Sequence, residues 1–152
     1  ESLDGFLQTS NNVLKQNVKT WLNSKRLIND SVDILDAKIV NLKIEFEAIS
    51  VDGANTVSVL NEAVSRLSTL YETKMDVGES FSITDVYSTL NAVPNLADTI
   101  SVKVTRASGT GYSTTNLNIK SQTTPDGRYI RAPKNVIFEV KYPNVDIQGT
   151  MK

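Results

Sequence analysis

The pattern of hydrophobic positions predicts an amphipathic α-helix between Asn55 and Tyr71, and the rest of the chain is organised around it. Hydrophobic residues recur every three or four positions, the spacing that lines one face of a helix. This face consists of Val57, Leu60, Ala63, Val64, Leu67, Leu70 and Tyr71. Polar residues such as Glu62 fill the opposite face. We therefore expect the helix to cover a second layer of structure.

Two segments on either side of this helix alternate between hydrophobic and polar residues, as strands with one buried face do. They run from Lys38 to Ile49 and from Thr99 to Thr105. The residues expected to face the helix are Val40, Leu42, Ile44, Phe46, Ala48, Ile100, Val102 and Val104. A shift of one residue would bury Lys43, Glu45 and Glu47 instead, so the register of the first strand is well specified.

Two further helices flank this block. One is predicted to begin at an N-cap at Thr9 or Ser10 and to reach Asn23, and the other to follow a cap at Ser82 or Thr84. Their hydrophobic stripes are Val13, Leu14, Val18, Trp21 and Leu22 in the first, and Ile83, Val86, Tyr87, Leu90 and Val93 in the second, which Pro94 stops. We interpret Trp21, the single tryptophan, as a packing anchor, because large aromatic side chains mostly supply buried area.

The C-terminal third is expected to be a loop followed by β structure. Residues Arg106–Asn116 are small and polar, which is typical of a mobile loop. A turn at residues 125–127 (Pro-Asp-Gly) predicts a hairpin between Leu117–Ile119 and Arg128–Arg131. Two later strands are indicated by Val136, Phe138, Val140 and Tyr142, and by Val145 and Ile147.

These elements predict a single α+β domain over residues 1–152. Its core is a β-α-α-β unit, a mixed sheet with two helices packed on one face. An N-terminal helix precedes this core and a C-terminal β-hairpin and strand extension follows it. Residues 1–30 form the helical lead-in, 31–105 the core, and 106–152 the loop and β extension. Because the chain opens on Glu1 and not on Met, we expect it to be part of a longer protein.

Composition excludes several kinds of chemistry. The chain has no cysteine and no histidine, so thiol nucleophiles, serine triads and the common zinc sites are absent. Asp30, Asp33 and Asp36 lack the spacing of a calcium loop, and we expect no metal and no cofactor. A formal net charge of −1 argues against nucleic acid as a partner, and no hydrophobic run is long enough to span a membrane.

One pair of carboxylates gives an enzymatic alternative. Glu45 and Glu47 stand two residues apart on one strand face, with Cα atoms about 6.5–7 Å apart, near the spacing of glycosidase acid pairs. One of them would need a raised pKa, whereas the adjacent Lys43 favours a lowered one. We therefore expect no enzymatic activity and interpret the pair as part of a solvated sheet face. Tyr112 and Tyr129 near the loops could contact a sugar or a protein, or pack as ordinary surface residues.

The order of the short motifs resembles that of the baseplate J-like family, the structural subunits of contractile-tail baseplates. The similar blocks are residues 28–49, and residues 77–104 with Gly78-Glu79, Ile83, Tyr87, Leu90, Asn91 and Val93-Pro94 in the matching places. The segment Ala132–Gly149 is similar to the C-terminal part of the baseplate wedge subunit of large myoviruses. A departure lies at residues 96–98 (Leu-Ala-Asp), where related sequences often have Gly-Val.

The resemblance implies a structural subunit of a phage tail baseplate wedge, located in the virion and assembled in the host cytoplasm. Its partners would be further copies of itself and other baseplate wedge proteins. We expect the interface among the residues left over by the predicted core and loops: Ile130, Ile137, Ile147, Tyr112 and Tyr129. Alternatives are a carbohydrate- or receptor-binding module of a phage tail and, less favoured, a glycan hydrolase that uses Glu45 and Glu47.

Overall fold

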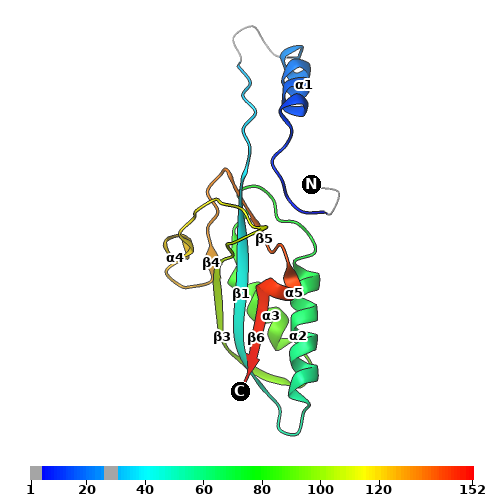
Figure 1. Cartoon of the computed structure of the whole chain (residues 1–152). Coiled ribbons are helices and arrows are strands. Elements are labelled where there is room, and N and C mark those ends of the chain that lie inside the picture. The colour runs from blue at the N-terminus through cyan, green and yellow to red at the C-terminus, as the bar shows by residue number, and fades with distance from the viewer. Residues whose placement is uncertain (1–4, 26–30) are drawn as a thin grey trace.

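A mixed β-sheet with β1 at its centre forms the framework of the protein (Figure 1). The computed structural model describes residues 5–25 and 31–152. β3 runs antiparallel along one side of β1, while β5 and β6 run parallel to β1 on its other side. The strands are β1 (Lys38–Ser50), β3 (Leu96–Arg106), β5 (Val136–Glu139) and β6 (Ile147–Met151). The predicted α+β fold with a mixed sheet is confirmed.

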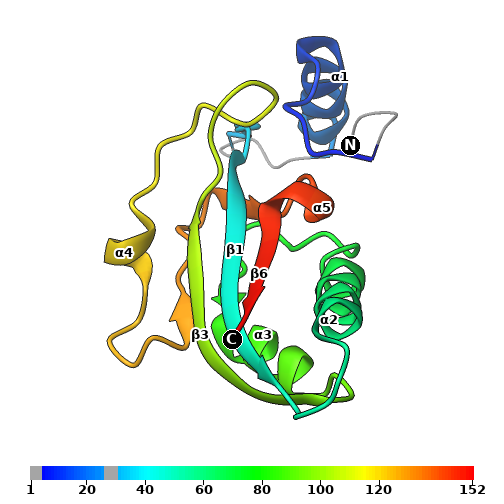
Figure 2. The same ribbon diagram turned by 60° about the horizontal axis from the view of Figure 1, so that its bottom comes forward.

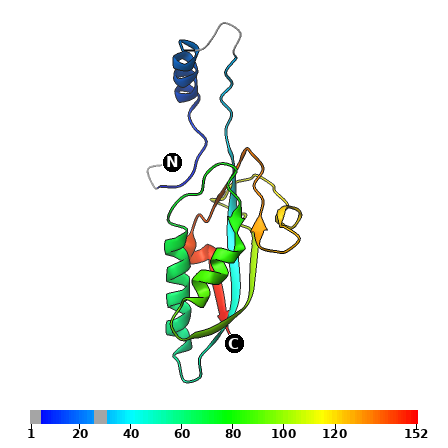
Figure 3. The ribbon, with the colours of Figure 1, turned by 180° about the vertical axis from the view of Figure 1, so that it is seen from behind.

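Two helices pack on one face of this sheet, as the sequence predicts, and both stand in front of the strands in Figure 3. α2 contacts β6, α3 contacts β3, and the two helices contact each other. The predicted cap of α2 is confirmed, because the side chain of Asn55 accepts hydrogen bonds at its start. Of the two candidates for α3, Thr84 and Ser82, the cap is Ser82, whose side chain accepts a hydrogen bond at the start of that helix. These helices are α2 (Thr56–Leu70) and α3 (Ile83–Asn91).

The hydrophobic core lies between these helices and the sheet. All five β1 residues predicted to face the helix are buried. The buried face of α2 differs from the prediction, because Val57 and Leu70 are exposed. The residues that α2 buries are Val59, Ala63 and Leu67, which are four positions apart and form a single ridge along the helix. Leu60, Val64 and Tyr71 pack against the core as partly buried residues. The predicted stripe was therefore wrong at Val57 and Leu70, and it did not include Val59.

The second predicted strand is longer than expected and carries a β-bulge. Ser101 lies opposite Glu47 and Thr99 lies opposite Ala48, so Ile100 has no partner on β1. The extra residue reverses the alternation beyond this point. Thr99 is consequently buried while Ile100 is exposed, which corrects the prediction that Ile100 faces the core.

The C-terminal strands join the main sheet, as the predicted mixed sheet requires, whereas the predicted hairpin before them does not form. β5 and β6 both pair with β1, and residues Leu117–Ile119, predicted as one strand of a hairpin, lead instead into α4 (Ile119–Gln122). A single bridge between Thr123 and Ile130 spans the predicted turn. The remaining elements are β2 (Phe81–Ser82), β4 (Tyr129–Ile130), which pairs with β2, and α5 (Pro143–Asp146).

The first helix, α1 (Asn12–Asn23), stands away from the sheet (Figures 1 and 2). It ends where the sequence predicts. Its N-cap is Asn11, whose side chain accepts a hydrogen bond from the N–H of Val13, and not Thr9 or Ser10. Residues 31–37, after α1, form no regular element, and Asp30 of the three aspartates considered for a calcium loop lies outside the described residues.

Candidate functional site

The hydrophobic stripe of α1 is exposed to solvent. Leu14, Val18 and Trp21 lie within roughly 60° of the helix circumference at 100° per residue, so they form one face, which we call the α1 stripe. Trp21 is 62% exposed and Leu14 is 56% exposed. The prediction that Trp21 is a packing anchor is therefore wrong for this chain on its own. No residue of α1 is buried.

The opposite edge of α1 is tied to the extended segment 31–37. The ammonium group of Lys15 lies 2.5 Å from the carboxylate of Asp36, and that of Lys19 lies 3.1 Å from Asp33. The hydrogen bond from Lys15 lowers the pKa of Asp36 below its ordinary value. We call α1 and segment 31–37 the arm, because both extend from the same end of the sheet (Figures 1 and 3). The two ion pairs turn the α1 stripe away from segment 31–37.

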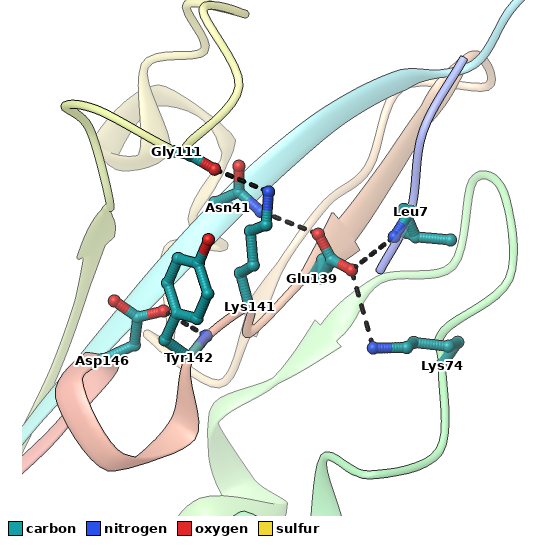
Figure 4. Close-up of polar contacts among 8 residues, drawn as sticks. All are labelled: Leu7, Asn41, Lys74, Gly111, Glu139, Lys141, Tyr142 and Asp146. Carbon is teal, nitrogen blue, oxygen red and sulfur yellow. Dashed lines mark hydrogen bonds and ion pairs between the residues drawn. The ribbon is translucent and has the colours of Figure 1, made fainter. Parts of the chain in front are cut away.

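Residues 5–8, which we call the strap, connect the arm back to the sheet. The backbone N–H of Leu7 donates a hydrogen bond of 2.8 Å to the carboxylate of Glu139 (Figure 4). The ring of Phe6 packs edge-on against Tyr142, with ring centroids 5.3 Å apart. The ammonium group of Lys141 lies 5.2 Å from the centre of the Phe6 ring, a cation–π distance. The strap therefore has a defined binding site on the domain.

Glu139 is the centre of this strap site and is only 4% exposed. Besides the strap, it accepts a hydrogen bond of 2.9 Å from the side-chain amide of Asn41 and lies 3.5 Å from the ammonium group of Lys74. The amide oxygen of Asn41 accepts a hydrogen bond from the backbone N–H of Ser113. A buried carboxylate needs such partners, because an unpaired charge in the interior is costly. The cluster joins the strap, β1, β5 and the loop at 107–118.

A second buried carboxylate, Asp146, fixes the same loop. The hydroxyl of Tyr112 donates a hydrogen bond of 2.6 Å to Asp146, and the backbone N–H of Tyr142 donates one of 2.8 Å. The bond to the carboxylate raises the pKa of Tyr112 to about 12. Lys141 donates a hydrogen bond to the carbonyl of Gly111, also in the loop. These bonds hold the loop against the end of the sheet where the strap binds.

The residues predicted to form an interface are mostly internal. Ile130, Ile137 and Ile147 are 0%, 8% and 3% exposed, so they offer no surface to a partner in this arrangement. The reason is topological: β5 and β6 pair with β1, and β4 pairs with β2. Ile130 and Ile147 belong to the hydrophobic core cluster, whereas Ile137 is buried outside that cluster, between Val136 and Phe138, which belong to it. The hydroxyl of Tyr112 donates a hydrogen bond to Asp146 of the same chain, whereas Tyr129 is exposed on β4.

Glu45 and Glu47 form surface ion pairs. Glu45 pairs with Lys43 and Lys103, and Glu47 pairs with Lys152. The hydrogen bond from Lys43 lowers the pKa of Glu45, the opposite of what a catalytic acid needs. This pair is therefore not arranged for glycoside hydrolysis.

A groove of about 720 Å³ between α2 and β6 lies elsewhere, and Glu72 is the one ionisable residue among those that line it. It lacks the pair of carboxylates that glycoside hydrolysis uses. Within residues 5–25 and 31–152, no group of three or more acidic side chains is placed to hold a metal ion.

Comparisons with known proteins add no support to the resemblance to the baseplate J-like family, which rests on the sequence motifs alone. No family model matches the chain, and no curated protein matches it in sequence. Among the described residues, no helix is both long and hydrophobic enough to cross a membrane. The features that distinguish this molecule are thus the exposed α1 stripe and the strap site. The sequence predicted the stripe, with Trp21 as a packing anchor, whereas Asn41 and Glu139 were not predicted as site residues.

Proposed function

We propose that this chain is a non-enzymatic assembly subunit whose arm makes contacts between subunits. The observation that carries the proposal is the α1 stripe, a face with an exposed tryptophan on a helix that stands off the domain. Exposed hydrophobic patches on a soluble protein mark interaction sites. Tryptophan is also among the residues that contribute most to binding energy at interfaces.

The arm as a whole offers more hydrophobic surface than α1 alone. Leu35, in segment 31–37, is 85% exposed. A specific interface buries at least about 1,000 Å² in total, and Leu35 adds to the surface that α1, a helix of 12 residues, offers. We therefore infer that a partner contacts both halves of the arm.

The resemblance to the baseplate J-like family suggests where this subunit acts, namely in the baseplate wedge of a contractile phage tail. In that setting the partners are further copies of the chain and other baseplate wedge proteins, and the site of action is the virion. The mechanism is mechanical: interfaces hold neighbouring subunits in one arrangement and allow a second one when the tail contracts. The arm continues into β1 through segment 31–37 and is held at its other end by the contacts of the strap. Such an arm suits this role, because it can change its angle while the sheet stays intact.

The alternative functions lack a feature that they need. A carbohydrate- or receptor-binding module needs exposed aromatic residues in a cluster, whereas the hydroxyl of Tyr112 is bonded to Asp146 and only Tyr129 of that predicted pair is exposed. A glycan hydrolase needs a carboxylic acid with a raised pKa, and the pKa of Glu45 is lowered.

The proposal is tested by measuring mass against protein concentration with light scattering. We expect the wild-type chain to form a species heavier than 16.7 kDa, and Val18→Asp to shift its formation to higher concentration. Val57→Asp is the matched control, since Val57 is an exposed valine on α2, outside the arm. A wild-type chain that stays monomeric, or equal effects of the two variants, would contradict the proposal.

A further inference from the structure

We propose that the strap site of one copy also binds the strap of a second copy, so that neighbouring subunits exchange their N-terminal segments. This inference rests on the proposed function, because it presumes that copies of the chain meet. It adds a second contact, distinct from the α1 stripe, and names its occupant. The occupant is an extended segment with a Phe-Leu pair, as residues 5–8 of this chain are.

The chemistry of the site is specific for a short segment. Two adjacent residues make defined contacts with the site. The ring of Phe6 packs against Tyr142 and lies near the ammonium group of Lys141. The backbone N–H of Leu7 donates a hydrogen bond to Glu139 (Figure 4). A hydrogen bond to a buried charged group is among the stronger ones in proteins. Recognition this local does not depend on how the segment is connected to the domain, so a strap from another copy makes the same contacts.

The site tolerates an exchange because Glu139 keeps partners when the strap leaves. The side-chain amide of Asn41 still donates a hydrogen bond of 2.9 Å to one carboxylate oxygen of Glu139. The ammonium group of Lys74 still lies 3.5 Å from the other oxygen. Release of the strap therefore does not leave Glu139 as a buried charge without a partner, which would be costly. The site can pass between straps without unfolding the domain.

Opening the arm costs little, which lets the strap reach another copy. The strap meets its own domain only because the chain runs out along α1 and returns along segment 31–37. Of the two ion pairs that join these halves, Lys19–Asp33 is exposed and Lys15–Asp36 is partly exposed. Ion pairs that reach solvent contribute little to stability. Exchange of an element between identical copies is a common low-cost route to association under such conditions.

A labelled peptide of residues 5–11 tests whether the site accepts a strap that is not its own. The host is the full chain with Phe6→Ala, which weakens its internal strap. We expect saturable binding by fluorescence anisotropy, and weaker binding to the wild-type chain, whose own strap competes. Peptides carrying Phe6→Ala or an N-methyl group on Leu7 should bind at least about tenfold more weakly. A Thr9→Ala peptide is the matched control and should bind as the unchanged peptide does.

Photocrosslinking tests whether whole chains exchange straps. Benzoylphenylalanine replaces Phe6 in a ¹⁵N-labelled chain, which is mixed with unlabelled chain at high concentration and irradiated. Exchange predicts covalent dimers in which residue 6 of a labelled chain is joined to the region around Tyr142 of an unlabelled one. Crosslinks that are exclusively internal would overturn the proposal, as would absence of peptide binding.

These results separate the failure of this inference from the failure of the proposed function. In one outcome the light-scattering mass of the wild type rises with concentration, Val18→Asp weakens that rise, and residue 6 crosslinks only within its own chain. The arm then assembles without exchange, and the present inference is wrong. If the peptide binds and crosslinks form while Val18→Asp has no effect, exchange stands and the α1 stripe is not the assembly surface.

Discussion

The helices α1 and α2 carry the same kind of hydrophobic pattern and meet opposite surroundings. α2 buries Val59, Ala63 and Leu67 against a sheet built from its own chain. α1 has an equally regular stripe, yet Leu14 and Trp21 are more than half exposed. Periodicity therefore predicts that a helix has a face to cover, but not whether the cover comes from the same chain. In α1 we infer that a partner supplies it.

Truncating a leucine in each helix gives the largest expected contrast. Leu67 is fully buried, so Leu67→Ala should lower the free energy of unfolding by about 2–5 kcal/mol, through lost burial and the cavity left behind. The measurement is a urea melt at a concentration where the chain is monomeric.

Leu14→Ala on α1 is the matched substitution and should change the free energy of unfolding by no more than about 0.5 kcal/mol under the same conditions. It should still weaken association, because Leu14 belongs to the α1 stripe. Equal losses of stability from the two variants would mean that α1 is an integral part of the folded core, and the comparison would fail.

The next contrast is between the bonds that fix the loop and those that fix the arm. Tyr112 donates to the buried carboxylate of Asp146, so Tyr112→Phe should cost about 1–2 kcal/mol of unfolding free energy. The pKa of Tyr112 is raised to about 12, so the folded state favours the protonated hydroxyl. The stability difference between wild type and Tyr112→Phe should therefore be complete below pH 10 and disappear as the pH rises through 12. A difference that is unchanged across this range would show that the hydroxyl is not bonded to Asp146.

The pair in the arm should have the smallest effect and the opposite pH dependence. Asp36→Asn should leave global unfolding unchanged and accelerate hydrogen exchange in α1, because the helix loses a tie to segment 31–37. The pKa of Asp36 is lowered below 3.8, so the ionised form is the one that the folded arm favours. The difference in exchange between wild type and variant should be present above about pH 4 and vanish as the pH falls below the lowered pKa. Asp52→Asn, which removes an exposed aspartate outside the arm, should not reproduce it.

The elements fixed by local chemistry were predictable from the sequence. The caps Asn55 and Ser82, and the register of β1, follow from side chains and alternation within a few residues. Alternation could not reveal the bulge at Ile100, because Ile100, Val102 and Val104 alternate without a break in the sequence, although the pairing with β1 shifts at Ile100. The burial of Ile137 depends on the pairing of β5 with β1, and the residues of a strand do not by themselves identify the strand with which it pairs.

The strap site was beyond such reasoning for a related reason. Asn41 and Glu139 occupy the positions of their strands that alternation assigns to solvent, and they lie opposite each other in register. They are buried because residues distant in sequence cover them. Glu139 is 98 residues from Asn41 and 132 from Leu7. Two polar residues that meet at the end of a sheet can be recognised only after the pairing of β1 with β5 is known.

The fluorescence of Trp21 tests the central claim most directly, because it is the only tryptophan of the chain and lies in the α1 stripe. Emission spectra are recorded across the concentrations at which light scattering follows the mass. The account predicts emission typical of a solvated indole in the dilute monomer, and a shift to shorter wavelength that tracks the rise in mass. A rise in mass with no change in emission would place the assembly surface elsewhere and contradict the role given to the arm.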